Sequence, residues 1–385
     1  MRGTGRRFAG RLQTRAGKKI SSNPGGFCQA RQDLPKEVVI DVSEHVPQQL
    51  RGQMGEGWPG LQRPIFMIDG TSLQLAHEAD LVEAFPPGRN QHGEHHWPVL
   101  KVAVFHDVQS GLALQPTWGP MFGEKAVSEQ ALAKEGLSRV PADGVVLTDC
   151  NFGIFDFACA VRSSGRGLIA RLTKERALRI LGRRPVGEAA EVAVVWEPSQ
   201  HDRRAHPDLP EGARLSGRVI VFRHRSRASE LIYLFTTLDL AAGEVKEIYK
   251  LRWNVETDLR SLKRTAAIHK LSGQSVDMVE KELMVAVTAY NMVRAVMCVA
   301  ARRAGMQPRE LSFSGALAVV QEGLPGLAQA DGEVDREERL ERMLNNAARL
   351  KIPKRSQQRS CPREVWGQGG KFPPRKRAAA EGDAK

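Results

Sequence analysis

Short apolar runs and alternating patterns fill the chain between residues 64 and 173 and predict β-strands. The strands are expected at PIFMIDGTSLQL (64–75), PVLKVAVFHD (98–107), SGLALQPTWG (110–119), GVVLTDCNF (144–152) and GLIARLT (167–173). Helical spacing predicts two helices among them, at 128–140, which has an acidic start, and from 152 to the glycine at 165. Strands that alternate with helices in this way are typical of an α/β domain.

A second pattern begins at residue 174. Three β-like runs, EVAVVWEP, RVIVFRHR and ELIYLFTTL, lie between residues 174 and 240 and predict a β-rich insertion. Amphipathic helices are then expected at 242–264, 276–303 and 333–350. The resulting order predicts a mixed sheet flanked by helices, with the insertion placed just before a helix of the core.

Composition divides the chain further. The first twenty residues contain seven Lys or Arg and no acid, and residues 349–377 contain ten against one acid. We therefore expect six parts. They are a basic disordered arm (1–20), a short N-terminal helical segment (21–62), a core built from 63–173 and 241–305, the β-strand insertion (174–240), C-terminal helices (306–348) and a basic tail (349–385).

The net charge of +13 over 385 residues indicates a polyanionic partner, of which nucleic acid is the most abundant. An anionic membrane surface is the alternative, but no run of eighteen apolar residues is present to span a bilayer. The five cysteines form no CxxC pair and no zinc-like cluster, so we expect a reducing, cytoplasmic compartment. They are Cys28, Cys150, Cys159, Cys298 and Cys361.

Two acids each end an apolar strand. Asp69 closes IFMID and Asp149 closes VVLTD. Ligands gather at the carboxyl ends of central strands, and paired carboxylates there suit a hard cation such as Mg²⁺. The alternative is that each Asp only begins a turn, since Asp-Gly and Asp-Cys-Asn are both turn sequences.

The stretch YKLRWNVETDLRSLK supplies a third acid. At 100° per residue, Tyr249, Arg252, Glu256 and Lys263 share a sector roughly 60° wide. This sector lies beside the apolar stripe that predicts the buried face of the helix, which is typical of a helix that lines a cleft. The stripe consists of Ile248, Leu251, Val255, Leu259 and Leu262.

Glu256 has a simpler interpretation. It can pair with Arg252 or Arg260, each four residues away, in exposed ion pairs worth only about 0.3–0.5 kcal/mol. Two histidine motifs are also candidate metal ligands. Without partner spacing, His95-His96 is expected in a loop and His106-Asp107 in a turn.

The spacing Tyr249-x2-Arg252-x3-Glu256-x6-Lys263 resembles the signature of bacterial insertion-sequence transposases of the IS-four type, a branch of the DDE transposases. IDGTSL resembles the first-acid motif of this family and LTDCNFG the second. The insertion, the helices after residue 263 and SSNPGGFCQARQDLP are also similar, so the resemblance covers 21–303. Two departures are Cys150-Asn151 after the second acid and a short N-terminal region, which suggests a truncated DNA-binding part.

The resemblance implies an RNase H-like fold in which Asp69, Asp149 and Glu256 hold two Mg²⁺ ions, with Mn²⁺ as a substitute. It implies metal-dependent cleavage at transposon ends and strand transfer into target DNA. The alternatives are a nuclease of the same fold that cuts without strand transfer, and a catalytically inactive DNA-binding remnant. The implied partners are double-stranded DNA, as inverted-repeat ends and target, and a second copy of the chain in a homodimer; a bacterial, nucleoid-associated protein without a membrane is expected.

The same resemblance assigns DNA contacts. Tyr249, Arg252 and Lys263 would hold end phosphates, for which Arg offers a bidentate contact and Lys a point charge. Trp253 has two interpretations: it stacks on an unstacked end base, or it is a partly buried core residue, which is the more common case.

Overall fold

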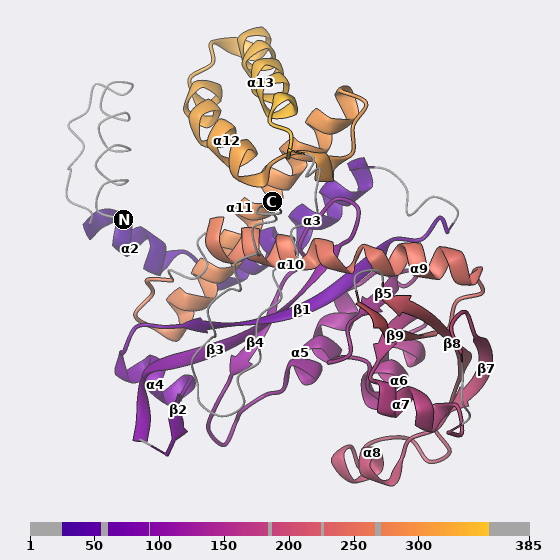
Figure 1. Ribbon diagram of the computed structural model, residues 1–385. Coiled ribbons are helices and arrows are strands. Elements are labelled where there is room, and N and C mark those ends of the chain that lie inside the picture. The colour runs from indigo at the N-terminus through magenta and orange to yellow at the C-terminus, as the bar shows by residue number, and fades with distance from the viewer. Residues whose placement is uncertain are drawn as a thin grey trace, which may run out of the picture. The chain divides into compact units, whose positions relative to one another are not determined.

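The computed structural model describes residues 25–54, 61–91, 93–183, 187–224, 227–265 and 271–353 (Figure 1). The chain forms two compact units, Met1–Leu350 and Lys351–Lys385, and the fold of the first is described here. The predicted basic arm and all but the first few residues of the predicted basic tail lie outside the described residues.

The described strands form one nine-stranded sheet. At its centre β3 pairs antiparallel with β1 and β4, while β5 and β6 continue the sheet parallel to β1. Three antiparallel strands followed by two parallel ones, in the order β4-β3-β1-β5-β6, form an RNase H-like sheet, so the predicted fold class is confirmed. The bounds are β1 Ile65–Gln74, β3 Gly93–Asp107, β4 Thr117–Pro120, β5 Val145–Thr148 and β6 Gly167–Leu172.

The insertion extends this same sheet. β9 (Arg227–Thr236) pairs antiparallel with β6, and β8 (Leu215–His224) and β7 (Glu191–Trp196) follow it outward. Side chains from the insertion, including Trp196 and Phe235, belong to the same buried cluster as the core strands. The insertion is therefore an extension of the core sheet. A short strand, β2 (Pro87–Asn90), pairs with β3 at the other end of the sheet.

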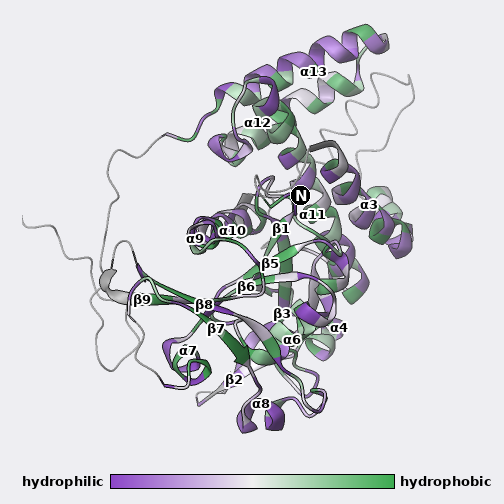
Figure 2. Ribbon diagram, turned by 90° about the vertical axis from the view of Figure 1, so that its right-hand side faces the viewer, coloured by the Kyte–Doolittle hydropathy of each residue, from purple (hydrophilic) through white to green (hydrophobic). Residues whose placement is uncertain are grey.

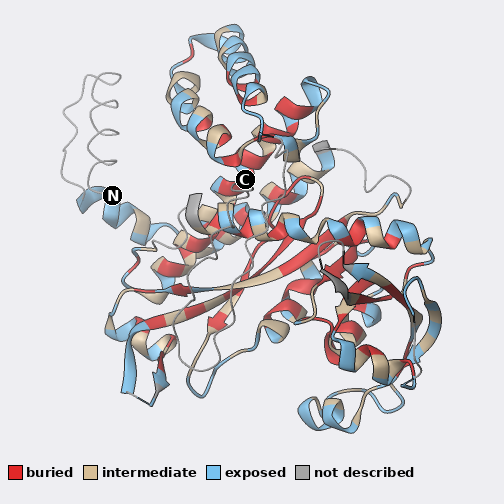
Figure 3. Ribbon diagram, in the orientation of Figure 1, coloured by how far each residue is buried: buried red, intermediate tan, exposed pale blue. Residues whose placement is uncertain are grey.

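Alternation along β1 fixes the two faces of the sheet. Phe66 and Ile68 pack with α5 and α6 on one face, whereas Ile65 and Met67 pack with α9 and α10 on the other, because successive strand residues point to opposite sides. The bounds of these helices are α5 Glu129–Gly136, α6 Phe155–Ser163, α9 Ala242–Lys250 and α10 Arg252–Arg260. In Figure 3 the start of β1 and the second half of β3 are buried, while α8 (Gln200–Ala205) is largely exposed.

The longest helix, α11 (Val276–Arg303), packs on the face of the sheet that carries α10. By length and composition α11 could cross a membrane, but 56% of its apolar window is buried inside the protein. It also buries Asn291 and Arg294, which bond to other parts of the chain. We therefore interpret α11 as a core helix.

The remaining helices are short or peripheral. They are α2 Gly25–Asp33, α3 Lys36–Met54, α4 Ala79–Ala84, α7 Lys174–Ile180, α12 Phe313–Ala328, α13 Gly332–Arg349 and 3₁₀ turns at Leu137–Arg139 and Pro308–Glu310. Figure 2 shows apolar residues gathered on the strands and largely polar surfaces on α8 and α13.

The structure corrects four predictions of local structure. The expected helix 242–264 is broken: α9 ends at Lys250, α10 starts at Arg252, and a π-helical turn follows at Ser261–Thr265. Of the predicted strand 110–119, only the end belongs to β4. His95-His96 and His106-Asp107, expected in a loop and a turn, lie within the fifteen-residue strand β3, which pairs with β1 over Val99–Asp107 and with β2 nearer its start.

Candidate active site

Asp69 and Asp149 lie side by side because their strands are parallel neighbours. The register pairs Ile65 with Val145 and Met67 with Leu147. Continued by two residues, this register places Asp149, just after β5, level with Asp69 in β1. The two acids therefore lie at the same level of adjacent strands, Asp149 just past the carboxyl end of β5 and Asp69 midway along β1, which continues to Gln74.

The loop after β5 holds Asp149 in a fixed orientation. Its Oδ1 accepts hydrogen bonds from the backbone N–H of Asn151, at 2.9 Å, and of Phe152, at 3.4 Å. A Cβ at Gly153 would lie 2.1 Å from the carbonyl oxygen of Arg171, so only glycine fits this close approach between the loop and β6. The LTDCNFG sequence thus has a structural reason for its glycine.

Glu256 reaches the same place from α10, which packs against β1. The pKa of Asp69 is raised from 3.8 to about 6, first by burial and then by the negative charges of Asp149, Glu129 and Glu256, while the Gly70 N–H opposes the shift. The three predicted acids therefore lie close enough to act on one another. Among the residues that the structure describes, neither Asp69 nor Asp149 forms an ion pair.

Glu256 also shows the simpler interaction that its spacing allows. Its Oε1 lies 2.9 Å from a guanidinium nitrogen of Arg252, and its side chain keeps 37% of its surface exposed. The ion pair and the approach to Asp69 occur together, so the two interpretations of this helix do not exclude each other.

Tyr249 is buried rather than presented to solvent, with 6% of its surface exposed. Its ring packs edge-on against Phe222. Burial raises the pKa of Tyr249, while the positive charges of Arg171 and Arg252 oppose the shift. Its hydroxyl therefore faces a basic environment beside Asp149, which also acts on it.

Trp253 is 59% exposed, so the expectation that it is a partly buried core residue is wrong. At 100° per residue it lies about 200° from Val255, which faces the core, and so it points outward. The guanidinium of Arg252 lies 4.7 Å from the centre of its ring. This leaves an aromatic face and a cation together at the surface of α10.

Lys263 ties the end of α10 to the first strand. Its ammonium group donates to Thr71 Oγ1 at 2.9 Å and to the Ser72 carbonyl oxygen at 3.1 Å. Both partners follow Asp69 in β1, so Lys263 brings a positive charge close to the first acid.

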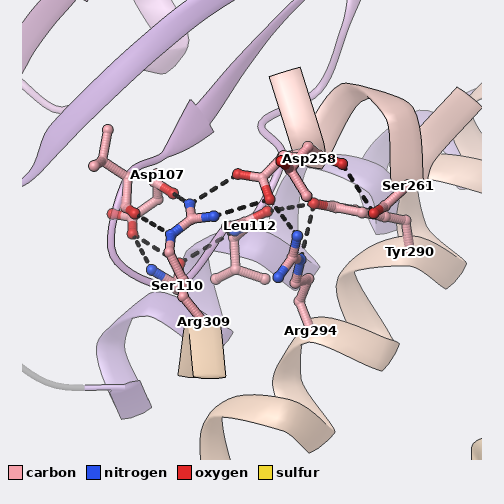
Figure 4. Close-up of polar contacts among 12 residues, drawn as sticks. Asp107, Ser110, Leu112, Asp258, Ser261, Tyr290, Arg294 and Arg309 are labelled. Carbon is pink, nitrogen blue, oxygen red and sulfur yellow. Dashed lines mark hydrogen bonds and ion pairs between the residues drawn. The ribbon is translucent and has the colours of Figure 1, made fainter. Parts of the chain in front are cut away.

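A buried acid two residues beyond Glu256 anchors α10 (Figure 4). Asp258 Oδ2 accepts from Arg309 at 2.8 Å, and its Oδ1 accepts from Arg309 at 3.0 Å and from Arg294. Arg294 lies on α11, and its Nε donates to the Tyr290 hydroxyl at 2.9 Å. The Asp258 network therefore holds α10 against α11, and in this way it positions Glu256 of the same helix relative to the sheet.

Sequence reasoning missed two residues of this region. Glu129, predicted only as the acidic start of a helix, lies against Gly70 and contributes to the raised pKa of Asp69. Arg171 lines a cavity of about 440 Å³ next to the second acid, together with Cys150, Lys174 and Tyr233. The only sequence signal for either was its position at the end of a predicted element.

A second acidic group lies on α6 and after α8. Ligand atoms of Asp156, His206 and Asp208 come within 4.8 Å of one another. The ammonium of Lys134 already lies 3.0 Å from Asp156 and 3.7 Å from Asp208, so this group is compensated by a cation of the chain. We interpret it as a structural ion-pair cluster.

Comparisons with known proteins identify the family of the chain. Residues 60–292 match the family model described as the transposase DDE domain. The chain is 26% identical over 356 residues to the transposase InsG for insertion sequence element IS4 of Escherichia coli (strain K12), which covers 91% of this chain and 78% of that protein. A cryo-EM structure of the piggyBac transposase synaptic complex with hairpin DNA aligns with a TM-score of 0.42 and 9% identity, over 76% of this chain and 58% of that one.

Proposed function

Because this chain belongs to the transposase DDE domain family and is a DNA transposase of the IS4 type, we propose that Asp69, Asp149 and Glu256 form its catalytic centre. The observation that carries the proposal is the convergence of the three carboxylates, two of them without an ion pair in the described part of the chain. We assign the catalytic core to residues 63–173 and 241–305, with 174–240 as an insertion that extends its sheet.

The chemistry of these residues fits a divalent cation. Carboxylate oxygens are the ligands that Mg²⁺ prefers. The pKa of Asp69 is raised first by burial and then by the neighbouring negative charges, and a cation bound between the carboxylates would favour their ionised form. Membership of the family implies a divalent metal; we propose that it is Mg²⁺, that two ions bind, and that Mn²⁺ can replace them.

Each part of the site has a task in the proposed reaction. Bound metal ions supply an activated water and charge stabilisation at the departing oxygen. Asp69 and Asp149 are fixed by the sheet, and Glu256 by the anchored helix, so the three carboxylates are preorganised. Water first breaks a phosphodiester bond at a transposon end, and the freed 3′-hydroxyl then attacks a phosphodiester of target DNA.

The cations around the site are placed to hold DNA. We propose that Arg252 and Lys263 contact end phosphates, because both lie beside the acids and carry positive charge. Tyr249 is proposed to orient the neighbouring guanidinium groups from its buried position. Trp253, exposed beside Arg252, is proposed to stack on an unpaired end base. A homodimer is proposed for the complex with two ends.

The experiment requires inverted repeats to be identified in the DNA that flanks the gene; these serve as labelled ends, with supercoiled plasmid as target. Asp69→Asn, Asp149→Asn and Glu256→Gln should abolish Mg²⁺-dependent cleavage while mobility-shift assays still detect DNA binding. Glu247→Gln, an exposed acid on α9, is the matched control and should cleave normally. Cleavage that survives any of the three substitutions removes that residue from the site. End cleavage without joined products would indicate a nuclease instead of a complete transposase.

A further inference from the structure

A fourth carboxylate faces the proposed site from the opposite layer of helices. Glu129 is the first residue of α5, whose start is capped by Ser128: its Oγ accepts from the Ala131 N–H at 3.0 Å. A Cβ built on Gly70 would lie 2.7 Å from both Cδ and Oε1 of Glu129. The carboxylate of Glu129 therefore packs against Gly70, the residue that follows Asp69.

The other oxygen of Glu129 is held by the loop of the second acid. Asn151 Nδ2 donates to Glu129 Oε2 at 2.7 Å, and the backbone N–H of the same Asn151 donates to Asp149 Oδ1 at 2.9 Å. Gln130 in turn donates to both oxygens of Asn151, at 3.0 and 2.9 Å. One asparagine therefore links Glu129 and Asp149, and the free oxygen of Glu129 is directed at Gly70.

In the part of the chain that the structure describes, no cation pairs with this carboxylate. Glu129 adds to the negative charge that raises the pKa of Asp69. An acid at a helix start interacts favourably with the helix dipole, which is the simple explanation for Glu129. That explanation requires no contact with Gly70 and no bond to the loop of Asp149, so it does not account for where the carboxylate is held.

We propose that Glu129 is a fourth carboxylate ligand of the divalent-cation site. Asn151 holds its carboxylate by a hydrogen bond, and Gly70 leaves room for it because any larger residue would place a Cβ against it. The inference rests on the proposed function, because it adds a ligand to the same site. It also assigns a role to Asn151, the residue at which this chain departs from the pattern of the family.

Metal binding by the full-length protein tests this proposal without activity measurements. Mn²⁺ is titrated into the metal-free protein, and free Mn²⁺ is followed by electron paramagnetic resonance. Glu129→Gln should weaken Mn²⁺ binding about 10–100-fold. Glu135→Gln, an exposed acid on the same helix, should bind as the unchanged protein does.

Thermal unfolding gives a second, independent readout. If Glu129 repels the other acids and is compensated only by metal, Glu129→Gln should raise the unfolding midpoint in chelator and reduce the increase that Mg²⁺ produces. A residue that serves only the dipole of α5 predicts the opposite: a lower midpoint in chelator and an unchanged increase with Mg²⁺. The latter result would overturn the inference.

Gly70→Ala provides a structural test of the same contact. The new methyl group would meet only atoms of Glu129 within its nearest contacts, so it should push the carboxylate away and weaken Mn²⁺ binding. In a Glu129→Ala background the same substitution should cause no further loss. An equal loss in both backgrounds would show that Gly70 acts by another route and would contradict the proposal.

The outcomes also separate the two proposals. If Asp69→Asn abolishes Mn²⁺ binding while Glu129→Gln does not change it, only the role of Glu129 fails. If Asp69→Asn leaves Mn²⁺ binding unchanged, or the unchanged protein binds none, the metal site of the proposed function fails with it.

Discussion

Two acids on one helix, Glu256 and Asp258, belong to regions with opposite electrostatics. Glu256 keeps 37% of its side chain exposed and approaches a group of carboxylates that includes Asp69 of β1 and Asp149 just after β5. Asp258 is 1% exposed and accepts hydrogen bonds from two arginines, Arg294 and Arg309. The difference teaches that burial alone does not distinguish the proposed catalytic acids. What distinguishes their region is a group of carboxylates in which Glu256 pairs with Arg252, while Asp69 and Asp149 form no ion pair within the described residues.

The pKa values of Asp258 and Asp69 are shifted in opposite directions. Burial opposes ionisation of Asp258, but the charges of Arg294 and Arg309 hold its pKa below the usual value. For Asp69 burial acts in the same direction as its acidic neighbours, and the pKa rises to about 6. The negative charge of Asp258 is compensated by arginines of the chain itself, whereas a bound cation would stabilise the ionised form of Asp69 and its acidic neighbours.

The largest expected effect separates the roles of the two regions. Asp69→Asn should lower the rate of end cleavage by at least about 10³-fold, or roughly 4 kcal/mol, because a metal ligand is lost. The free energy of unfolding in chelator should stay the same or increase, since one repelling charge is removed. Rates come from single-turnover cleavage and stability from urea unfolding; a protein that loses both together would place Asp69 among the structural acids.

Asp258→Asn should have the reverse signature. It leaves Arg294 buried with an uncompensated charge, so we expect a loss of about 3–5 kcal/mol in the free energy of unfolding, measured in urea. The matched control is Glu341→Gln, which breaks an exposed ion pair with Arg303 and should cost under about 1 kcal/mol. A small loss for Asp258→Asn would mean that the network contributes little to holding α10.

The strands and two of the acids could be predicted because their signals are local. An unbroken apolar run indicates a strand that is covered on both faces, and Asp69 and Asp149 each end such a run. Once two such strands are parallel neighbours, their terminal acids meet. The pairing of Glu256 with Arg252 was also foreseeable, since the two are four residues apart on one helix.

The remaining features depend on contacts that are distant in sequence. The partners of Asp258 lie 36 and 51 residues away, so its sequence context resembles that of any acid on an amphipathic helix. Glu129 contacts Gly70 only because α5 packs against β3 and β4. The extension of the sheet by the insertion similarly depends on the pairing of β9 with β6.

A buried histidine beside the Asp258 network should make stability depend on pH. Burial lowers the pKa of His106 from 6.5 to about 4; Asp258 opposes the shift, and Arg294 and Arg309 add to it. Between these values the unfolded chain binds a proton that the folded protein does not, so stability should fall as the pH is lowered from 6.5 toward 4, by up to roughly 3 kcal/mol.

The measurement is urea unfolding across this pH range. His106→Leu should remove that part of the slope, while His45→Gln, at an exposed histidine, should retain it. An identical slope in His106→Leu and the unchanged protein would contradict the assignment of the buried proton site.

The smallest expected effect concerns Trp253, which lies on the exposed side of the same helix. Since the ring is 59% exposed and packs mainly with Arg252, Trp253→Ala should change the free energy of unfolding by about 0.5 kcal/mol or less. If the ring stacks on an unpaired end base, affinity for a cleaved end with one unpaired base should fall by about 1–3 kcal/mol. Affinity for a fully paired end should change less, because its bases remain stacked on one another.

Trp253→Phe sharpens this test, because it keeps an aromatic face and should recover most of the affinity for the unpaired end. The three proteins are compared by fluorescence anisotropy at one salt concentration, since phosphate contacts make every affinity depend on salt. Equal losses on paired and unpaired ends would show that Trp253 acts only by supporting the Arg252 guanidinium. In that case α10 would contribute charge alone to DNA binding, and the contrast between its exposed and buried faces would be purely electrostatic.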